Sequence, residues 1–369
     1  MNNESILKII KTLASERAPS GLEKKRGDIF KLEIGKILDN KGISIKIDEL
    51  GNYYVKLKGT AGKDKESIAI LAHLDEIGGT IRRIKKDGKL EFSKRGGYEG
   101  RWLISRKIKI LNYEGKWING VIFGRSTHST PDSLRVKEKI EPLELEIYIG
   151  ATDKNEVVKD YKIHIGAPFV FDGDFDLLNP EINKNIIAGY SMDNLAALTC
   201  LIALTQKIVN NLMTDFGTLK ISHDVYIVAT TREEIGTEGA LYFIRNNIVK
   251  NVIAIDIGLV ADFSGAITSD IELTKGPVIV WQDSSGKGIY DYNLCKAFKD
   301  IAEKNSIEYQ NGVFEFYGSD AGIAQKWLGI PSVLIGIPVM FSHNVPEICT
   351  LNGIDTGAEL VFQYLKSLK

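Results

Sequence analysis

The sequence has little cysteine, which argues against a disulfide-rich protein. Only three of its 369 residues are cysteine, namely Cys200, Cys295 and Cys349, and they lie far apart along the chain. An odd number of widely spaced cysteines favours reduced thiols over a disulfide framework. We therefore expect a cytoplasmic protein rather than a secreted one.

Net charge and long apolar runs are also scarce. The chain carries 47 Lys and Arg against 48 Asp and Glu, so no global basic field attracts nucleic acid or an anionic membrane. The apolar stretch 333–341 is far shorter than the roughly 20 residues that span a membrane. Lys8 and Lys11 interrupt the apolar residues near the N-terminus, which indicates an amphipathic helix and not a signal peptide. We expect neither nucleic acid nor membrane as a partner.

The chain is long enough for two domains, or for one domain with a large insertion. Between about 77 and 165, short apolar runs alternate with glycine-containing turns, which predicts an all-β domain. From 194 onward, predicted strands at 224–230, 252–257 and 332–336 alternate with predicted helices. This alternation is typical of a mostly parallel α/β sheet flanked by helices. The strands expected within 43–71 need that sheet as a partner, so we predict one α/β domain interrupted by a β insertion.

Polar residues where the predicted strands end or helices begin are the candidates for function, because open α/β sheets bind ligands at the carboxyl ends of their strands. These candidates are His73, Asp75, Asp193, Glu233, Glu234, Asp256 and His343. Each has an ordinary explanation by itself: Asp193 as a helix N-cap, for example, or His343 as a buried, hydrogen-bonded histidine. Together, two imidazoles and several carboxylates suit a pair of divalent ions such as Zn²⁺, with one carboxylate bridging and another acting as a base.

The order and spacing of these motifs resemble the tetrahedral aminopeptidases, also called the glutamyl aminopeptidase family, which are dinuclear zinc or cobalt exopeptidases. The resemblance spans nearly the whole chain. The matching segments are 19–23 (PSGLE), 72–78 (AHLDEIG), 191–194 (SMDN), 233–236 (EEIG) with 239–240, Asp256, 318–321 (GSDA) and 342–343.

The resemblance implies a role for each candidate and a fold like that of the zinc exopeptidases. His73 and Asp256 would bind one metal ion, Glu234 and His343 the other, and Asp193 would bridge the two ions. Glu233 would be the general base, and Asp75 would orient His73. The implied catalytic domain comprises residues 1–75 and 177–369. The insertion, 76–176, would be a dimerisation domain that helps build twelve-subunit tetrahedral particles acting on peptides.

Two residues depart from the pattern that the family usually shows. Leu195 follows Asn194 where an arginine is usual, and Arg232 replaces a residue that is commonly uncharged. Neither departure removes an expected metal ligand. Two other functions stay open at this point: a deacylase or carboxypeptidase on the same metal scaffold, and a catalytically inactive assembly subunit of the same fold.

Overall fold

The computed structural model describes residues 1–39, 41–60, 67–124, 128, 140–261, 269–284 and 288–368. The chain divides into two compact units. Unit 1 comprises Met1–Asp75, Phe175–Ser342 and Glu347–Lys369, and unit 2 comprises Glu76–Asp174 and His343–Pro346. Each unit has its own sheet.

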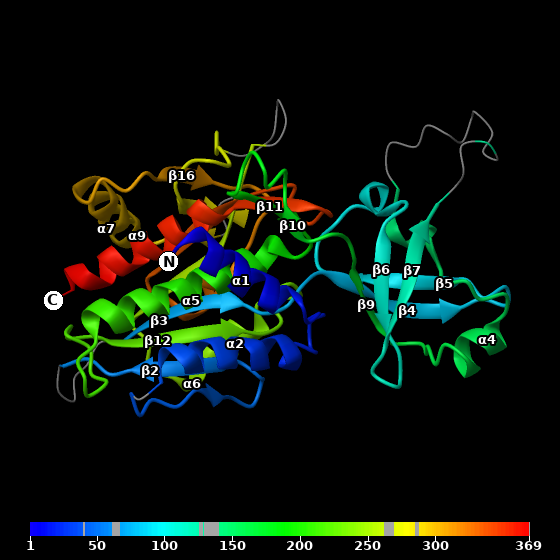
Figure 1. Ribbon diagram of the computed structural model, residues 1–369, viewed down its shortest axis with the longest axis horizontal. Coiled ribbons are helices and arrows are strands. Elements are labelled where there is room, and N and C mark those ends of the chain that lie inside the picture. Colours follow the sequence, from blue (N-terminus) through cyan, green and yellow to red (C-terminus); the bar gives the residue numbers. More distant parts are fainter. Residues whose placement is uncertain are drawn as a thin grey trace. The chain divides into compact units, whose positions relative to one another are not determined.

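The described part of unit 1 forms one mixed sheet of twelve strands (Figure 1). Its main path is β1-β2-β12-β3-β13-β17-β18-β11-β10, and β14, β15 and β16 extend the sheet from β17. The strands are β1 (Lys46–Ile47), β2 (Tyr53–Leu57), β3 (Ser67–His73), β10 (Asp176–Leu177), β11 (Ile186–Gly189), β12 (Asp224–Thr230), β13 (Asn251–Leu259), β14 (Val278–Asp283), β15 (Gly288–Ile289), β16 (Gln310–Val313), β17 (Ser332–Met340) and β18 (Glu347–Thr350). The four central strands β12, β3, β13 and β17 run parallel, whereas β2, β14 and β18 join them antiparallel. The predicted α/β class is confirmed, with a parallel centre in a mixed sheet.

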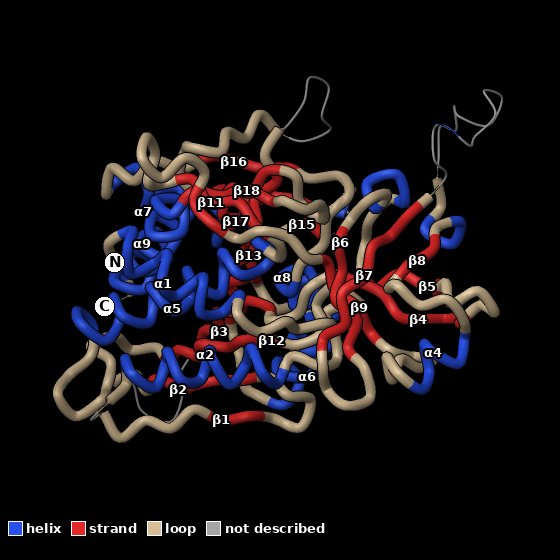
Figure 2. Tube along the Cα trace, turned by 45° about the vertical axis from the view of Figure 1, so that its right-hand side comes forward, coloured by secondary structure: helices blue, strands red, loops and turns tan. Residues whose placement is uncertain are grey.

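Helices cover both faces of this sheet, which explains why its central strands are apolar throughout. Along β3, Ile68 and Ile70 join one core cluster, whereas Ala69 and Leu71 join another, because successive side chains point to opposite faces. The first cluster is shared with α1 (Asn3–Ala14), α2 (Lys24–Ile37), α5 (Met192–Leu212), α7 (Tyr292–Lys304) and α9 (Leu351–Ser367). The second is shared with α6 (Glu238–Asn246) and α8 (Asp320–Leu328). Helices from the two ends of the chain, α1 and α9, pack against each other and against α5 (Figure 2).

The central helix α5 is 21 residues long and apolar along most of its length. Of the described helices, it is the one whose length and composition would allow it to cross a membrane. However, 72% of its apolar window is buried inside the protein, and a core helix of a soluble fold passes the same test. Its residues pack against β3 and β13, so α5 supports the strands that carry the candidate site.

Unit 2 is built on a closed six-stranded barrel in the order β4-β5-β8-β7-β6-β9 (Figure 1). The strands are β4 (Gly78–Ile84), β5 (Leu90–Arg95), β6 (Lys107–Leu111), β7 (Trp117–Phe123), β8 (Glu146–Tyr148) and β9 (Pro168–Phe171). Phe92 and Phe169 meet edge to face in its core, with ring centroids 5.2 Å apart. The short helices η1 (Gly100–Leu103), η3 (Pro142–Glu144) and α4 (Lys154–Lys159) add to the expected strands.

Candidate metal centre

The register of three neighbouring strands brings candidate residues to one level of the sheet. Thr230, at the end of β12, pairs with His73 at the end of β3. On the other side of β3, Ala254 of β13 pairs with Leu71, so continuing that register by two residues brings Asp256 level with His73. Asp256 does not end its strand, as the sequence had suggested, because β13 continues beside β17 to Leu259.

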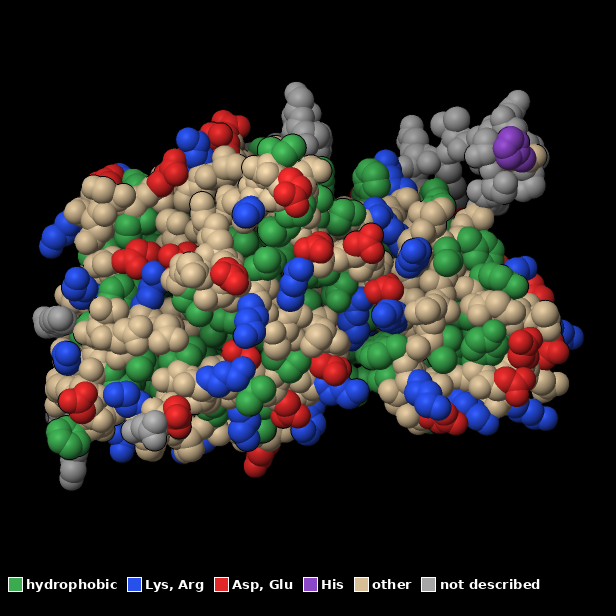
Figure 3. Space-filling view, viewed as in Figure 1, with side chains coloured by type: hydrophobic (Ala, Val, Ile, Leu, Met, Phe, Trp, Pro, Cys, Tyr) green, Lys and Arg blue, Asp and Glu red, His purple; other side chains and the backbone are tan. Residues whose placement is uncertain are grey.

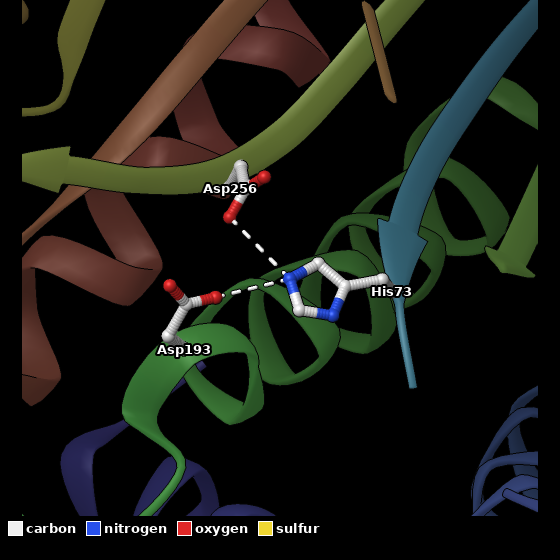
Figure 4. Close-up of side chains that lie close together, drawn as sticks. All are labelled: His73, Asp193 and Asp256. Atoms are coloured by element: carbon white, nitrogen blue, oxygen red, sulfur yellow. Dashed lines mark hydrogen bonds and ion pairs between the residues drawn. The ribbon is translucent and has the colours of Figure 1, made fainter. Parts of the chain in front are cut away.

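His73, Asp193 and Asp256 form a buried group in which ligand atoms of all three lie within 4.8 Å of one another (Figure 4). The Nε2 atom of His73 lies 3.0 Å from Oδ1 of Asp193 and 3.8 Å from Oδ1 of Asp256. Asp193 is in the first turn of α5 with non-helical dihedral angles, and the N-cap of this helix is Ser191. The N-cap alternative for Asp193 is therefore wrong, and its carboxylate faces His73 instead.

Asp75 is fully buried and accepts hydrogen bonds from several parts of unit 1. Its carboxylate receives the hydroxyl of Ser20 at 2.7 Å and the backbone N–H groups of Glu233 and Glu234 at 2.9 and 3.2 Å. Its Oδ1 atom also lies 3.4 Å from Nδ1 of His73. Asp75 thus links the imidazole to the loop that carries the two glutamates, an arrangement that fixes the orientation of a ligating histidine.

Glu233 and Glu234 lie in the loop after β12, beside the buried group. Oε2 of Glu233 is 3.9 Å from Nε2 of His73, and its side chain is 11% exposed. One carboxylate oxygen of Glu234 lies within 4.8 Å of a carboxylate oxygen of Asp193. The guanidinium of the neighbouring Arg232 binds Glu238 at 3.0 Å.

The electrostatics of the group favour a cation. Burial raises the pKa of Asp256 to about 8, and the charge of Asp193 adds to this rise. Burial also raises the pKa of Glu233 well above its ordinary value, with a further contribution from Asp256. For His73, burial opposes protonation, but the carboxylates of Asp193 and Asp75 outweigh it and hold the pKa well above the usual range. A bound divalent cation would relieve the repulsion among the carboxylates.

The donor atoms also suit such a cation. One imidazole nitrogen and two carboxylate oxygens are ligands that Zn²⁺ and related divalent ions accept. All three side chains are buried, and the second nitrogen of His73 is held by Asp75. The residues present therefore fit a bound metal ion.

His343, the other predicted histidine ligand, is the third residue after the end of β17. It begins the segment His343–Pro346, which groups with unit 2, where its ring Nδ1 contacts the carbonyl oxygen of Gly97. Its part in metal binding stays a prediction.

Three side chains near the group were missed as contributors by reasoning from the sequence. Ser20 holds Asp75, and Glu347 accepts the backbone N–H of Asp193 at 3.1 Å. Asp320, at the start of α8, accepts the hydroxyl of Thr230 at 2.6 Å. Ser20 and Asp320 do lie in motif segments that carried the resemblance, whereas nothing in the local pattern around Glu347 marks it.

Comparison with known proteins identifies similar sequences and folds. Residues 51–360 match the family described as M42 glutamyl aminopeptidase. A lysyl aminopeptidase of Pyrococcus furiosus is 26% identical over 341 residues, covering 90% of this chain and 90% of the relative.

Solved structures agree with this match. An aminopeptidase of the archaeon Desulfurococcus kamchatkensis is 28% identical, with a TM-score of 0.85 over 98% of this chain and 95% of that chain. The TET1 peptidase of Pyrococcus horikoshii is 27% identical, with a TM-score of 0.79 over 98% of this chain and 99% of that chain. That peptidase can assemble into a tetrahedron or a large octahedral shell.

Proposed function

Because the chain belongs to the M42 glutamyl aminopeptidase family and is a metal-dependent aminopeptidase, we propose that it removes N-terminal residues from peptides with two metal ions bound per chain. The observation that carries the proposal is the buried group of His73, Asp193 and Asp256, whose ligand atoms lie within 4.8 Å of one another. Zn²⁺ and Co²⁺ are the proposed metals, since both accept nitrogen and oxygen ligands.

The proposed ligand sets follow the geometry of unit 1 and the order of the chain. His73 and Asp256 would hold one ion, with Asp193 bridging to the second. Glu234, close to Asp193, would hold the second ion. His343 would complete that set, since it follows β17, which runs parallel to the strand that carries Asp256.

In the proposed mechanism, the bound ions would lower the pKa of a water molecule and polarise the carbonyl of the scissile peptide bond. Glu233 would take a proton from that water and would pass it to the departing amine. Burial raises the pKa of Glu233 above its ordinary value, which favours acceptance of a proton. Asp75 keeps the ring of His73 and the backbone of Glu233 in place through the contacts described above.

Replacing Asp75 by Asn tests this positioning role. The amide of asparagine would place an N–H group opposite one of the groups that now donate a hydrogen bond to Asp75. The side chain would then no longer hold both His73 and the loop of Glu233 and Glu234. We expect metal affinity and kcat/KM each to fall about 10–100-fold. Metal titration and steady-state kinetics measure both. Ser20→Ala, which removes one donor and keeps the carboxylate, should have the smaller effect, and wild-type values in Asp75→Asn would refute the role.

A substrate panel tests the proposed function. Aminoacyl and N-acylated aminoacyl chromogenic substrates are assayed with Zn²⁺ or Co²⁺, with Glu233→Gln as the inactive control. Hydrolysis of the free-amine compounds alone supports the proposal. Hydrolysis of the acylated compounds would instead support a deacylase. Absence of hydrolysis in a protein purified without chelator and lacking metal would support an inactive subunit.

Neither alternative is favoured by the comparisons. The matching family and the named relatives are aminopeptidases. In addition, the group that faces His73 consists of buried carboxylates, which a non-catalytic assembly subunit has no need to keep close together.

We propose that the chain self-associates. Dimers would form through unit 2 and would combine into a tetrahedral particle of twelve chains. The assembly of the Pyrococcus horikoshii peptidase supports this proposal. Exposed apolar side chains on the barrel also support it, including Val121 and Tyr148, which are paired across β7 and β8. Sedimentation velocity of the purified protein would test it, and a monomer at micromolar concentration would refute it.

The proposed location is the cytoplasm, without nucleic acid or membrane as partner. All three cysteines are free and buried, which suits a reducing compartment. On the face shown in Figure 3, basic and acidic side chains are interspersed, in agreement with the net charge of −1. Fractionation of the native cells would test this location.

A further inference from the structure

Asp320 is a buried carboxylate that is only half satisfied. It is the first residue of α8 and is 3% exposed. Its Oδ2 atom accepts the hydroxyl of Thr230 at 2.6 Å, whereas its buried Oδ1 atom has no hydrogen-bond partner among the described residues. An anionic oxygen without a donor is costly inside a protein, and a favourable position at a helix N-terminus returns less than this cost. Such an atom indicates a ligand that supplies the missing donor.

Asp320 lies at the same end of the sheet as the candidate metal centre. Its hydrogen-bond partner Thr230 is paired with His73 in the register of β12 and β3. The helix that it begins packs against β3 and β13, the strands that carry His73 and Asp256. The charge of Asp320 contributes to the raised pKa of both Glu233 and Asp256, as expected for a close neighbour. Among the described residues, however, Asp320 does not belong to the group formed by His73, Asp193 and Asp256.

We propose that Asp320 binds the free α-amino group of the substrate. This inference rests on the proposed function and deepens it by naming the residue that recognises the N-terminus. A protonated amine offers three N–H donors and a positive charge, which match a buried anionic oxygen lacking a donor. An acylated N-terminus offers neither the charge nor the full set of donors, so this contact would select free N-termini. Thr230 would hold the carboxylate in place through its hydroxyl.

A pair of inhibitors that differ only in the amine tests the proposal. Leucinethiol and 4-methylpentane-1-thiol share a side chain and a metal-binding thiol, so any preference for the side chain cancels in their ratio. Calorimetry on the metal-loaded protein gives both dissociation constants without depending on turnover. We expect the wild type to bind leucinethiol about 10–100-fold more tightly, since a hydrogen bond to a charged group contributes on that order. In Asp320→Asn the ratio should fall to nearly one.

Asp283→Asn is the matched control. Asp283 is another buried aspartate, 1% exposed, whose carboxylate accepts the hydroxyl of Tyr290 and which has no part in the proposed chemistry. Asp283→Asn should keep the wild-type ratio of the two dissociation constants. A changed ratio in this control would show a general effect of removing a buried charge.

The following results would overturn the inference. One is an unchanged ratio in Asp320→Asn; another is an equal loss of affinity for both thiols, which would indicate a structural role only. A third result comes from the wild type alone and does not depend on the folding of a variant. If the wild type binds the two thiols with nearly equal dissociation constants, the amine is not recognised. Failure of the proposed function looks different, because the wild type would then hydrolyse no aminoacyl substrate in the panel, whatever the thiol ratio.

Discussion

Glu233→Gln should lower kcat by about 10²–10⁴ and leave the metal content unchanged. Glutamine keeps the size of the side chain but cannot accept a proton. Oε2 of Glu233 lies 3.9 Å from Nε2 of His73, and the backbone N–H of Glu233 is anchored on Asp75, so the carboxylate is held beside a proposed metal ligand. Steady-state kinetics on a free-amine substrate, together with elemental analysis of the same preparation, measure both quantities.

The matched control is Glu238→Gln. Glu238 is five residues further along the chain, where it pairs with Arg232 and is 47% exposed. Glu238→Gln should retain wild-type kcat, because an exposed ion pair contributes little to the stability of the fold that holds the site. Loss of metal from Glu233→Gln would make Glu233 a ligand instead of a base, and unchanged turnover would remove it from the mechanism.

Asp193→Ala should abolish binding of both proposed metal ions and lower kcat by more than about 10³. The carboxylate of Asp193 is 3.0 Å from Nε2 of His73 and within 4.8 Å of Glu234, so it is the proposed ligand common to both ions. A metal ion that binds only the folded state stabilises that state and raises Tm. The rise in Tm on adding metal should therefore be absent in Asp193→Ala.

The metal-free proteins provide a second comparison for Asp193→Ala. Burial and the charge of Asp193 both raise the pKa of Asp256, so removing Asp193 relieves repulsion when no cation is present. The same change removes the ion pair between Asp193 and His73, which opposes this gain, so the chelated variant and the chelated wild type should unfold at similar temperatures. Thermal unfolding with and without chelator checks this, with Asp300→Ala on the exposed face of α7 as the control. A variant that still binds two ions would contradict the bridging role.

The main elements of unit 1 were predictable because their cores are apolar with clear periodicity. Between their end residues, the strands β3, β12 and β13 are apolar apart from Asp256 inside β13. This is expected for strands that are covered on both faces. The short strands β14, β15 and β16 and the helix α8 were not predicted, since the strands are short and glycine residues interrupt the pattern. The end of β13 was also placed too early, because a polar aspartate inside a buried strand looks like a strand end.

The residue types of the candidate site were visible in the sequence, but their contacts were not. Strand order determines which carboxylates face His73, and this order depends on long-range pairing between β12, β3 and β13. The binding of Asp75 to the backbone of Glu233 and Glu234 depends on the path of a loop, which side-chain identity does not encode. For the same reason, the half-satisfied state of Asp320 only becomes visible in three dimensions.

The wide spacing of the site along the chain also matters during synthesis on the ribosome. His73 leaves the ribosome roughly 180 residues before Asp256, and both partner strands of β3, β12 and β13, follow unit 2 in the sequence. At about 5–20 residues per second, this delay is roughly ten to forty seconds. The nascent chain consequently has no assembled peptidase centre during that interval, so a newly made molecule cannot act on the N-termini of other emerging chains.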